Sequence, residues 1–209
     1  MIVMLDTSED LAVCATELRC RVEQLFTPLT RRKPQTGSVN FAIDNGAYSR
    51  FDPAGFERLL DRLRLQQHWC RFVAVPDVVG SAIRTSEVFA YWHRLPTMRG
   101  WPLAYVCQDG QDAHPIPWPW VRAVFIGGST DFKMGPVAAQ CIKAAQAMGK
   151  WTHVGRVNTP GRFEYFEKLG VDSIDGTGLA RYSHMRERVA HSISTPQLFD
   201  TTTEEGNDE

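Results

Sequence analysis

Seven short apolar runs, each ending in or followed by a polar residue or glycine, constrain most strongly what this chain can fold into. They are residues 1–5, 39–44, 71–77, 102–108, 121–128, 151–155 and 171–175. Most are continuously apolar and most are separated by helical patterns, which is typical of parallel strands buried on both faces. The alternation therefore predicts an α/β protein whose parallel sheet is covered by helices.

Helices are expected between most of these runs. After the first run, Ser8 can cap a helix whose apolar side runs through Leu11, Leu18, Val22 and Leu25. Further helices are predicted over residues 52–63, 85–92, 136–148, 159–169 and 182–193. The proline-rich segment 109–120 is predicted to be a loop, because proline removes a helical hydrogen bond and clashes with the preceding turn.

The ends of the runs decide between two architectures. They offer the residues Asp44, Asp77, Gln108, Gly127, Gly128, His153, Gly155 and Asp175. An open doubly wound sheet gathers its ligand at one switch point, whereas a (β/α)₈ barrel places site residues at the ends of many strands. We therefore expect residues 1–195 to form one compact, trimmed TIM-type (β/α)₈ barrel, with an eighth strand still to be placed, and residues 196–209 to be a disordered acidic tail.

Composition limits the class of protein. No stretch approaches the roughly 20 apolar residues that cross a membrane, and the start of the chain has no signal-peptide pattern, so we expect a cytoplasmic protein with no membrane partner. The formal net charge is −1, but residues 1–200 carry +3, because four acidic residues lie in the last nine. This mild basic balance is compatible with an anionic partner.

The five cysteines are widely spaced without a CxxC pair, which predicts reduced, mostly buried thiols and no metal site.

Each strand-end residue also has a purely structural interpretation. Asp175 can cap the next helix, Asp44 can form a turn, and Asp77 can be a cap. Gln108 can be a surface amide, Gly127 and Gly128 can form a flexible turn, and His153 can be a buried histidine with satisfied hydrogen bonds. Together, however, the residues describe a pocket with three carboxylates, an amide and two backbone N–H groups that a ligand can approach.

Five segments follow one another in a definite order. They are DNGAYSRF at Asp44, VPDVVGS at Asp77, AYVCQDG at Gln108, VFIGGS at Gly127 and HVGRVNTPGRFEYFEKLGVDSID ending at Asp175. In this order they resemble motifs of the queuine and archaeosine tRNA-guanine transglycosylase superfamily. They are most similar to its short bacteriophage relatives, which insert 7-deazaguanine bases into DNA. The resemblance spans about residues 40–180.

The resemblance implies a pentosyltransferase that exchanges guanine in DNA for a 7-deazaguanine, such as 7-cyano-7-deazaguanine, through a covalent aspartyl-deoxyribose intermediate. It implies that Asp175 is the nucleophile and that Asp44 is the general acid and base. The implied base-binding residues are Asp77, Gln108, Gly127, Gly128, Tyr48, His153 and Gly155. Tyr48 can stack on a flipped nucleotide, although ordinary packing is the stronger interpretation of this residue.

Two departures from the family refine this expectation. No cysteine follows Cys141, so the zinc subdomain of the tRNA enzymes is absent, and Asp44 is followed by NGAY where the family has SGG. A chain this short favours duplex DNA over tRNA as substrate, together with free guanine and free 7-deazaguanine, without a cofactor and, for a bacteriophage protein, in the host cytoplasm. The expected DNA-binding residues are Arg31, Arg32, Lys33, Arg156 and Arg181, with solubilising surface charge as the alternative.

Two other functions fit the same sequence pattern. A barrel enzyme acting on a small phosphorylated metabolite would use Gly127 and Gly128 as its phosphate turn. A non-catalytic DNA-binding module would keep the basic loops and use its carboxylates only as helix caps. The sequence does not define the inserted base, the DNA target sequence or the oligomeric state.

Overall fold

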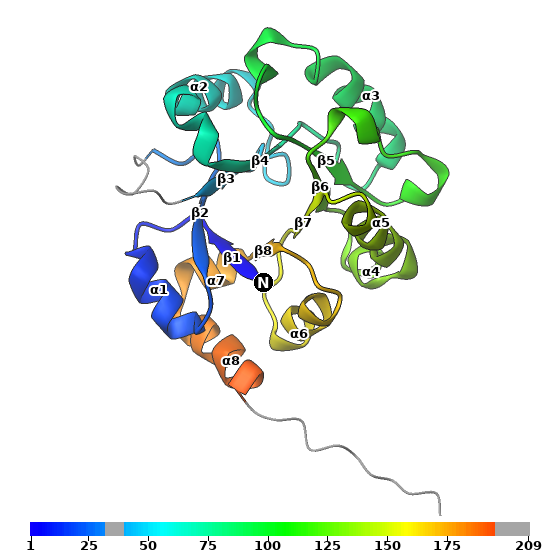
Figure 1. Cartoon of the computed structure of the whole chain (residues 1–209). Coiled ribbons are helices and arrows are strands. Elements are labelled where there is room, and N and C mark those ends of the chain that lie inside the picture. The colour runs from blue at the N-terminus through cyan, green and yellow to red at the C-terminus, as the bar shows by residue number, and fades with distance from the viewer. Residues whose placement is uncertain (32–39, 195–209) are drawn as a thin grey trace, which may run out of the picture.

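Eight parallel strands close into a barrel in the computed structural model, which describes residues 1–31 and 40–194 (Figure 1). They follow chain order around the barrel, and β1 pairs with β8 to close it. The strands are β1 (Ile2–Leu5), β2 (Val22–Phe26), β3 (Phe41–Ile43), β4 (Cys70–Ala74), β5 (Leu103–Cys107), β6 (Ala123–Ile126), β7 (Trp151–Val154) and β8 (Ser173–Asp175). The predicted TIM-type (β/α)₈ barrel is confirmed. The predicted tail of residues 196–209 lies outside the described residues.

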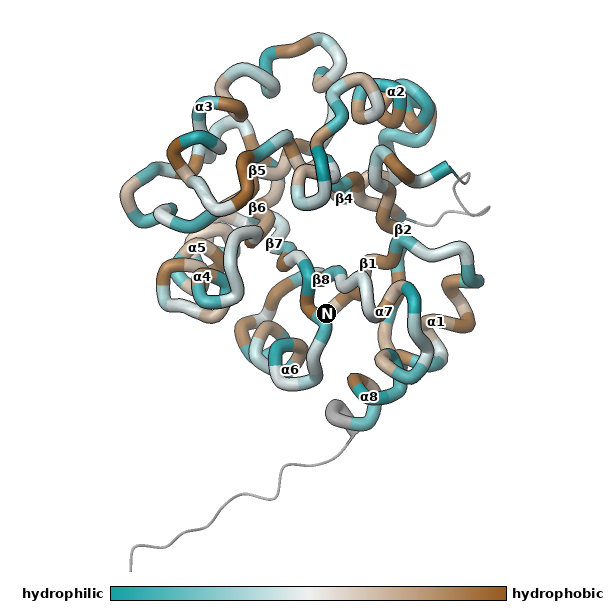
Figure 2. The backbone as a smooth tube through the Cα atoms, turned by 180° about the vertical axis from the view of Figure 1, so that it is seen from behind, coloured by the Kyte–Doolittle hydropathy of each residue, from teal (hydrophilic) through white to brown (hydrophobic). Residues whose placement is uncertain are grey.

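Helices surround the barrel on the outside of the strand ring (Figure 1). They are α1 (Leu11–Leu18), α2 (Pro53–Leu63), α3 (Ala82–Trp92), α4 (Thr130–Met134), α5 (Pro136–Ala147), α6 (Pro160–Lys168), α7 (Thr177–Arg181) and α8 (Ser183–Ser194). Hydrophilic and hydrophobic residues alternate along these helices in Figure 2, as expected for helices with one face on the barrel. The Asp52 cap with Pro53 at the first turn is confirmed, whereas α1 is capped by Asp10 and not by Ser8.

The strand that the sequence did not reveal is β2. A single helix through Leu18, Val22 and Leu25 was the wrong expectation: α1 ends at Leu18, and Arg19 takes a left-handed conformation with φ of 53°. Val22 and Leu25 continue a helical spacing only by coincidence. The polar residues between them look like a solvated helix face, yet Glu23 is 1% exposed because it faces the barrel interior.

The segment between β5 and β6 carries no α-helix, as its prolines predict. It contains only two short 3₁₀ turns, η3 (Gln111–Ala113) and η4 (Trp118–Trp120). The short connection trims the outer layer of the barrel here without interrupting the strand order.

The barrel interior is apolar at its middle and ionic at its lower end. The buried interior residues are Met4, Leu25, Ala42, Phe72, Ala74, Ala104, Val106, Ala123 and Phe125. At the amino-terminal ends of the strands, Glu23 pairs with Arg71 at 2.8 Å and with Arg21 at 2.7 Å, and Arg71 lies 5.0 Å from the centre of the Trp151 ring. This ionic cluster lies at the amino-terminal end of the barrel, opposite the carboxyl ends of the strands, where TIM barrels place their active sites.

All five cysteines are free thiols, and Cys14, Cys107 and Cys141 are buried. In residues 1–31 and 40–194, no helix is both long and apolar enough to span a bilayer.

Candidate active site

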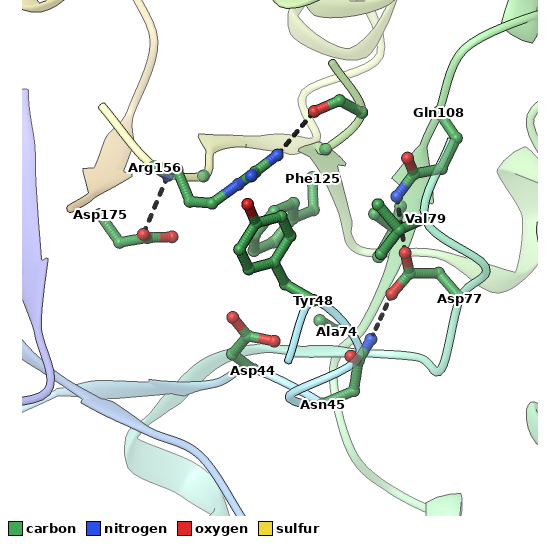
Figure 3. A pocket seen from close by; sticks show the side chains of 14 residues that line it. Asp44, Asn45, Tyr48, Ala74, Asp77, Val79, Gln108, Phe125, Arg156 and Asp175 are labelled. Atoms are coloured by element: carbon green, nitrogen blue, oxygen red, sulfur yellow. Dashed lines mark hydrogen bonds between the residues drawn. The ribbon is translucent and has the colours of Figure 1, made fainter. Parts of the chain in front are cut away.

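Polar residues and glycines at six successive strand ends, from β3 to β8, line one narrow pocket at the carboxyl end of the barrel (Figure 3). Its polar and glycine residues are Asp44, Asn45, Tyr48, Asp77, Gln108, Gly127, Gly128, Gly155, Arg156 and Asp175. All but Asn45 are residues that the sequence singled out. Parallel strands point their carboxyl ends to the same side, which explains why distant motifs converge here.

Asp175, the last residue of β8, has both carboxylate oxygens held from behind. Oδ1 accepts from the backbone N–H of Arg156 at 3.0 Å, and Oδ2 lies 2.9 Å from Nε2 of His153. Asp175 does not cap the following helix, because the N-cap of α7 is Gly176. The carboxylate is therefore fixed in one orientation at the pocket.

His153 supports this carboxylate and does not reach the pocket. Its side chain is fully buried, its Nδ1 lies 2.9 Å from the Ser173 hydroxyl, and its ring packs 4.8 Å from Phe72 and 4.6 Å from Phe125 between centroids. The structure thus places His153 beneath Asp175, where it cannot touch a base, in contrast to the expected base contact.

Asp44 follows β3 and faces the same pocket. Its Oδ1 accepts from the Gly46 N–H at 2.9 Å, so the expected turn is present as well. Burial, aided by the nearby charge of Asp175, raises the pKa of Asp44 from 3.8 to about 7. Near neutral pH this carboxyl can therefore both give and take a proton.

Asp77 is held by two amides. Nδ2 of Asn45 donates to Oδ1 at 2.7 Å, and Nε2 of Gln108 donates to Oδ2 at 2.6 Å. The other end of the Gln108 amide accepts from the Gly80 N–H at 2.9 Å, which fixes the amide with its nitrogen toward Asp77. Burial raises the pKa of Asp77, and the two amides oppose that rise. Gln108 is 2% exposed, so it is not a surface amide.

Glycines keep one wall of the pocket free of side chains. A Cβ on Gly127 would lie 2.7 Å from Nε2 of Gln108, and one on Gly155 would lie 2.7 Å from the Phe125 ring. The Gly127 N–H donates within the barrel to Cys107, whereas the Gly128 N–H has no partner among the described residues. Of the two expected backbone donors, only that of Gly128 remains for a ligand.

Arg156 folds into the pocket, although the sequence led us to expect a DNA contact. Its guanidinium lies 3.7 Å from the centre of the Tyr48 ring and donates to the Gly128 carbonyl at 2.7 Å. Figure 3 shows Arg156 and Tyr48 together over the slot in front of Phe125. In this arrangement the Arg156 side chain is a pocket residue.

Lys133 lies behind this wall and was not singled out from the sequence. It is 3% exposed, and its Nζ donates to the Gly155 carbonyl at 2.9 Å. The same peptide unit gives its N–H, on Arg156, to Asp175. Burial, together with the neighbouring Arg156 charge, lowers the pKa of Lys133 to about 8. The ammonium group thus braces the peptide that holds Asp175.

A second, wider cavity of about 730 Å³ opens beside the pocket. It is bordered by the loops after β1, β2 and β3 and by α7. Asp44, Tyr48, Arg156 and Asp175 line both spaces, so they stand at the junction.

The basic residues predicted to bind DNA have different positions. Arg181 lines the wide cavity and is exposed, and Arg31 is exposed as well. Arg32 and Lys33 lie outside the described residues. Arg186, five residues after Arg181, is 1% exposed and pairs with Glu9 at 2.6 Å, so it holds α8 to the body of the barrel.

Asn45 and Lys133 are the residues that sequence reasoning missed. Asn45 directly follows Asp44, so its strand-end position could have revealed it. Lys133 sits inside a short helix and carries no sequence signal. Within the described ranges, no group of three histidine, cysteine or acidic side chains is placed to hold a metal ion.

Comparisons with known proteins support the fold and do not identify an activity. No protein-family model and no curated protein matches the sequence. Similar solved structures include native KDPGal, with 13% identity and a TM-score of 0.48 over 92% of this chain and 93% of the other. Phosphoribosyl anthranilate isomerase from Thermus thermophilus has 12% identity and a TM-score of 0.47 over 92% and 97%. A flavocytochrome b2 mutant has 10% identity and a TM-score of 0.52 over 91% of this chain and 61% of its own.

Proposed function

We propose that this protein is a DNA-guanine transglycosylase, a pentosyltransferase that replaces guanine in DNA by a 7-deazaguanine. The observation that carries the proposal is the position of Asp175 and Asp44 at the junction of a narrow pocket and a wide cavity. A nucleotide whose base enters the pocket and whose sugar remains in the cavity brings its C1′ atom to these two carboxylates. The sequence resemblance implies that Asp175 is the nucleophile and that Asp44 is the general acid and base.

The exchange takes place in two displacements. An oxygen of Asp175 attacks C1′, the bond from C1′ to guanine N9 breaks, and Asp44 gives its proton to the leaving base. The incoming 7-deazaguanine then loses its N9 proton to Asp44 and attacks C1′, and the ester bond to Asp175 breaks. Two inversions retain the configuration, and Asp44 ends as it began.

The polar wall of the pocket fits the guanine edge. Guanine presents N1–H and N2–H₂ donors beside its O6 acceptor, and a 7-deazaguanine presents the same edge. Asp77 supplies acceptors for the donors, and the Gly128 N–H and the second hydrogen of the Gln108 amide are available for O6. One pocket can then serve the leaving base and the entering base.

Specific observations disfavour the two alternatives. A phosphate at the Gly127 turn would meet three carboxylates, and the Gly127 N–H already donates to Cys107. In a module that uses its carboxylates as caps, Asp77 and Asp175 would hold helix ends. Instead the N-cap of α3 is Ser81 and that of α7 is Gly176.

The direct test is release of labelled guanine from duplex DNA in the presence of 7-cyano-7-deazaguanine, with tRNA as the control substrate. We expect release from DNA and none from tRNA. Release from tRNA alone, or from neither nucleic acid, would contradict the proposal.

A further inference from the structure

Leu29 stands out on the rim of the wide cavity. It lies on the loop after β2, borders the cavity, and is 81% exposed. Single exposed leucines are common on protein surfaces, and Leu65, on the 3₁₀ turn η1 (Arg64–Trp69), is 86% exposed. What distinguishes Leu29 is the backbone that carries it and the cavity beside it.

The turn that presents Leu29 is braced from several sides. The Thr30 N–H donates to the Thr27 carbonyl at 2.9 Å, and the Thr27 N–H donates to the Thr30 hydroxyl at 2.9 Å. The Thr30 hydroxyl also reaches Asp6 at 3.0 Å, and Arg62 donates to the Thr30 carbonyl at 2.7 Å. These hydrogen bonds hold the apolar side chain at a fixed place in solvent. On a flexible loop, the same side chain could fold inward.

The surroundings of Leu29 suit a nucleic-acid backbone. Arg50 and Arg181 are exposed and line the same cavity, and Arg31 is exposed two residues further along the chain. These cations can contact phosphates, while Asp175 lies at the inner end of the cavity. A strand held by Arg50 and Arg181 would run along the cavity that Leu29 also borders.

We propose that Leu29 is a wedge that enters the DNA duplex and fills the space left when the target nucleotide turns out into the active site. This inference rests on the proposed function, because it presumes that the substrate base starts inside a stacked duplex. Extruding a base costs stacking and pairing energy, and an apolar side chain inserted between base steps offsets part of that cost. A single strand needs no such wedge.

The first experiment compares exchange in a duplex with exchange in the same strand alone. We expect Leu29→Ala to slow exchange in the duplex by about tenfold or more and to change the single-strand rate by less than about twofold. Leu29→Met should restore the duplex rate, and Leu65→Ala should leave both rates unchanged. Equal losses on both substrates, or no loss on either, would overturn the wedge while leaving the transglycosylase proposal standing.

The second experiment does not depend on exchange. A duplex carries 2-aminopurine at the target position, and its fluorescence reports loss of stacking when the wild-type protein binds. We expect a rise that Leu29→Ala abolishes and Leu65→Ala keeps. If the wild type exchanges no guanine, the proposed transglycosylase activity is refuted. The fluorescence measurement would still decide whether Leu29 acts as a wedge. No rise in fluorescence with the wild type, or the same rise with Leu29→Ala, would refute the proposal that Leu29 is a wedge.

Discussion

The guanidinium of Arg156 lies 3.7 Å from the centre of the Tyr48 ring and closes the narrow pocket from above. It is planar, it is charged, and it is tied to the Gly128 carbonyl at 2.7 Å. A purine that stacks on Tyr48 must take the place of this group. In this conformation the guanidinium covers the Tyr48 face to which the proposed function assigns base stacking, so stacking on that face requires Arg156 to move.

We expect Arg156→Ala to bind free 7-deazaguanine more tightly than the wild type. Displacing the guanidinium costs a cation–π contact and a hydrogen bond, and removing that cost should tighten binding by about tenfold, or ~1.4 kcal/mol. Calorimetric titration measures the change, with the exposed Arg50→Ala as the matched control. Weaker binding in Arg156→Ala would mean instead that the guanidinium contacts the bound base.

Asp77→Ala should weaken binding of the same base, because the guanine-type donors lose a charged acceptor. The expected loss is roughly 10- to 150-fold, or ~1.5–3 kcal/mol. The substitution also leaves the amides of Asn45 and Gln108 without their acceptor, so thermal unfolding must accompany the titration. Asp112→Ala, an exposed acidic residue outside the pocket, is the control. Unchanged affinity in a folded Asp77→Ala protein would remove Asp77 from base recognition.

The raised pKa of Asp44 predicts a stability profile. Between pH 3.8 and about 7 the folded protein binds more protons at this group than the unfolded chain does. The contribution of Asp44 to the free energy of unfolding therefore falls as pH rises through this range and is constant above it. Asp44→Asn, whose amide oxygen can still accept from Gly46, should lose this dependence. Denaturant unfolding at pH 5 and pH 8 compares the two proteins, and an equal pH difference in both would contradict the raised pKa.

The architecture was predictable because its signal is local. Apolar runs and capped helices alternate, and the Asp52 cap and the proline-rich loop before β6 lie where the sequence places them. The strand β2 was not predictable in this way, because the charge of Glu23 inside the barrel is compensated not only by its neighbour Arg21 but also by Arg71, which lies 48 residues further along the chain. Spacing within one segment cannot reveal such a partner.

The candidate site, like the fold, was predictable only where its signal is local. Strand ends identify Asp44, Asp77, Gln108 and Asp175, since the fold itself brings them together. The direction of a side chain is different, because it depends on contacts between loops. Arg156 turned inward to Tyr48 and Gly128, where its sequence position suggested an exposed contact with DNA.

The nucleophile assignment is tested most directly by Asp175→Asn. An asparagine can keep both contacts of the carboxylate: its oxygen accepts from the Arg156 N–H, and its amide donates to Nε2 of His153 once the histidine proton sits on Nδ1 toward Ser173. We therefore expect a stability close to that of the wild type. Exchange and the covalent adduct should both disappear, because an amide is a poor nucleophile toward C1′.

The readout is denaturing electrophoresis after incubation with labelled duplex DNA, with and without the incoming base. Wild-type protein should carry label that the incoming base removes, and Asp44→Asn should accumulate it, since attack by Asp175 persists while proton transfer from the entering base and to the leaving base is impaired. A folded Asp175→Asn protein that still exchanges guanine at the wild-type rate would refute the covalent mechanism. If Asp175→Asn loses both exchange and its fold, a second variant, Asp175→Glu, distinguishes loss of the fold from loss of the nucleophile. Its carboxylate keeps its charge but moves away from the Arg156 N–H.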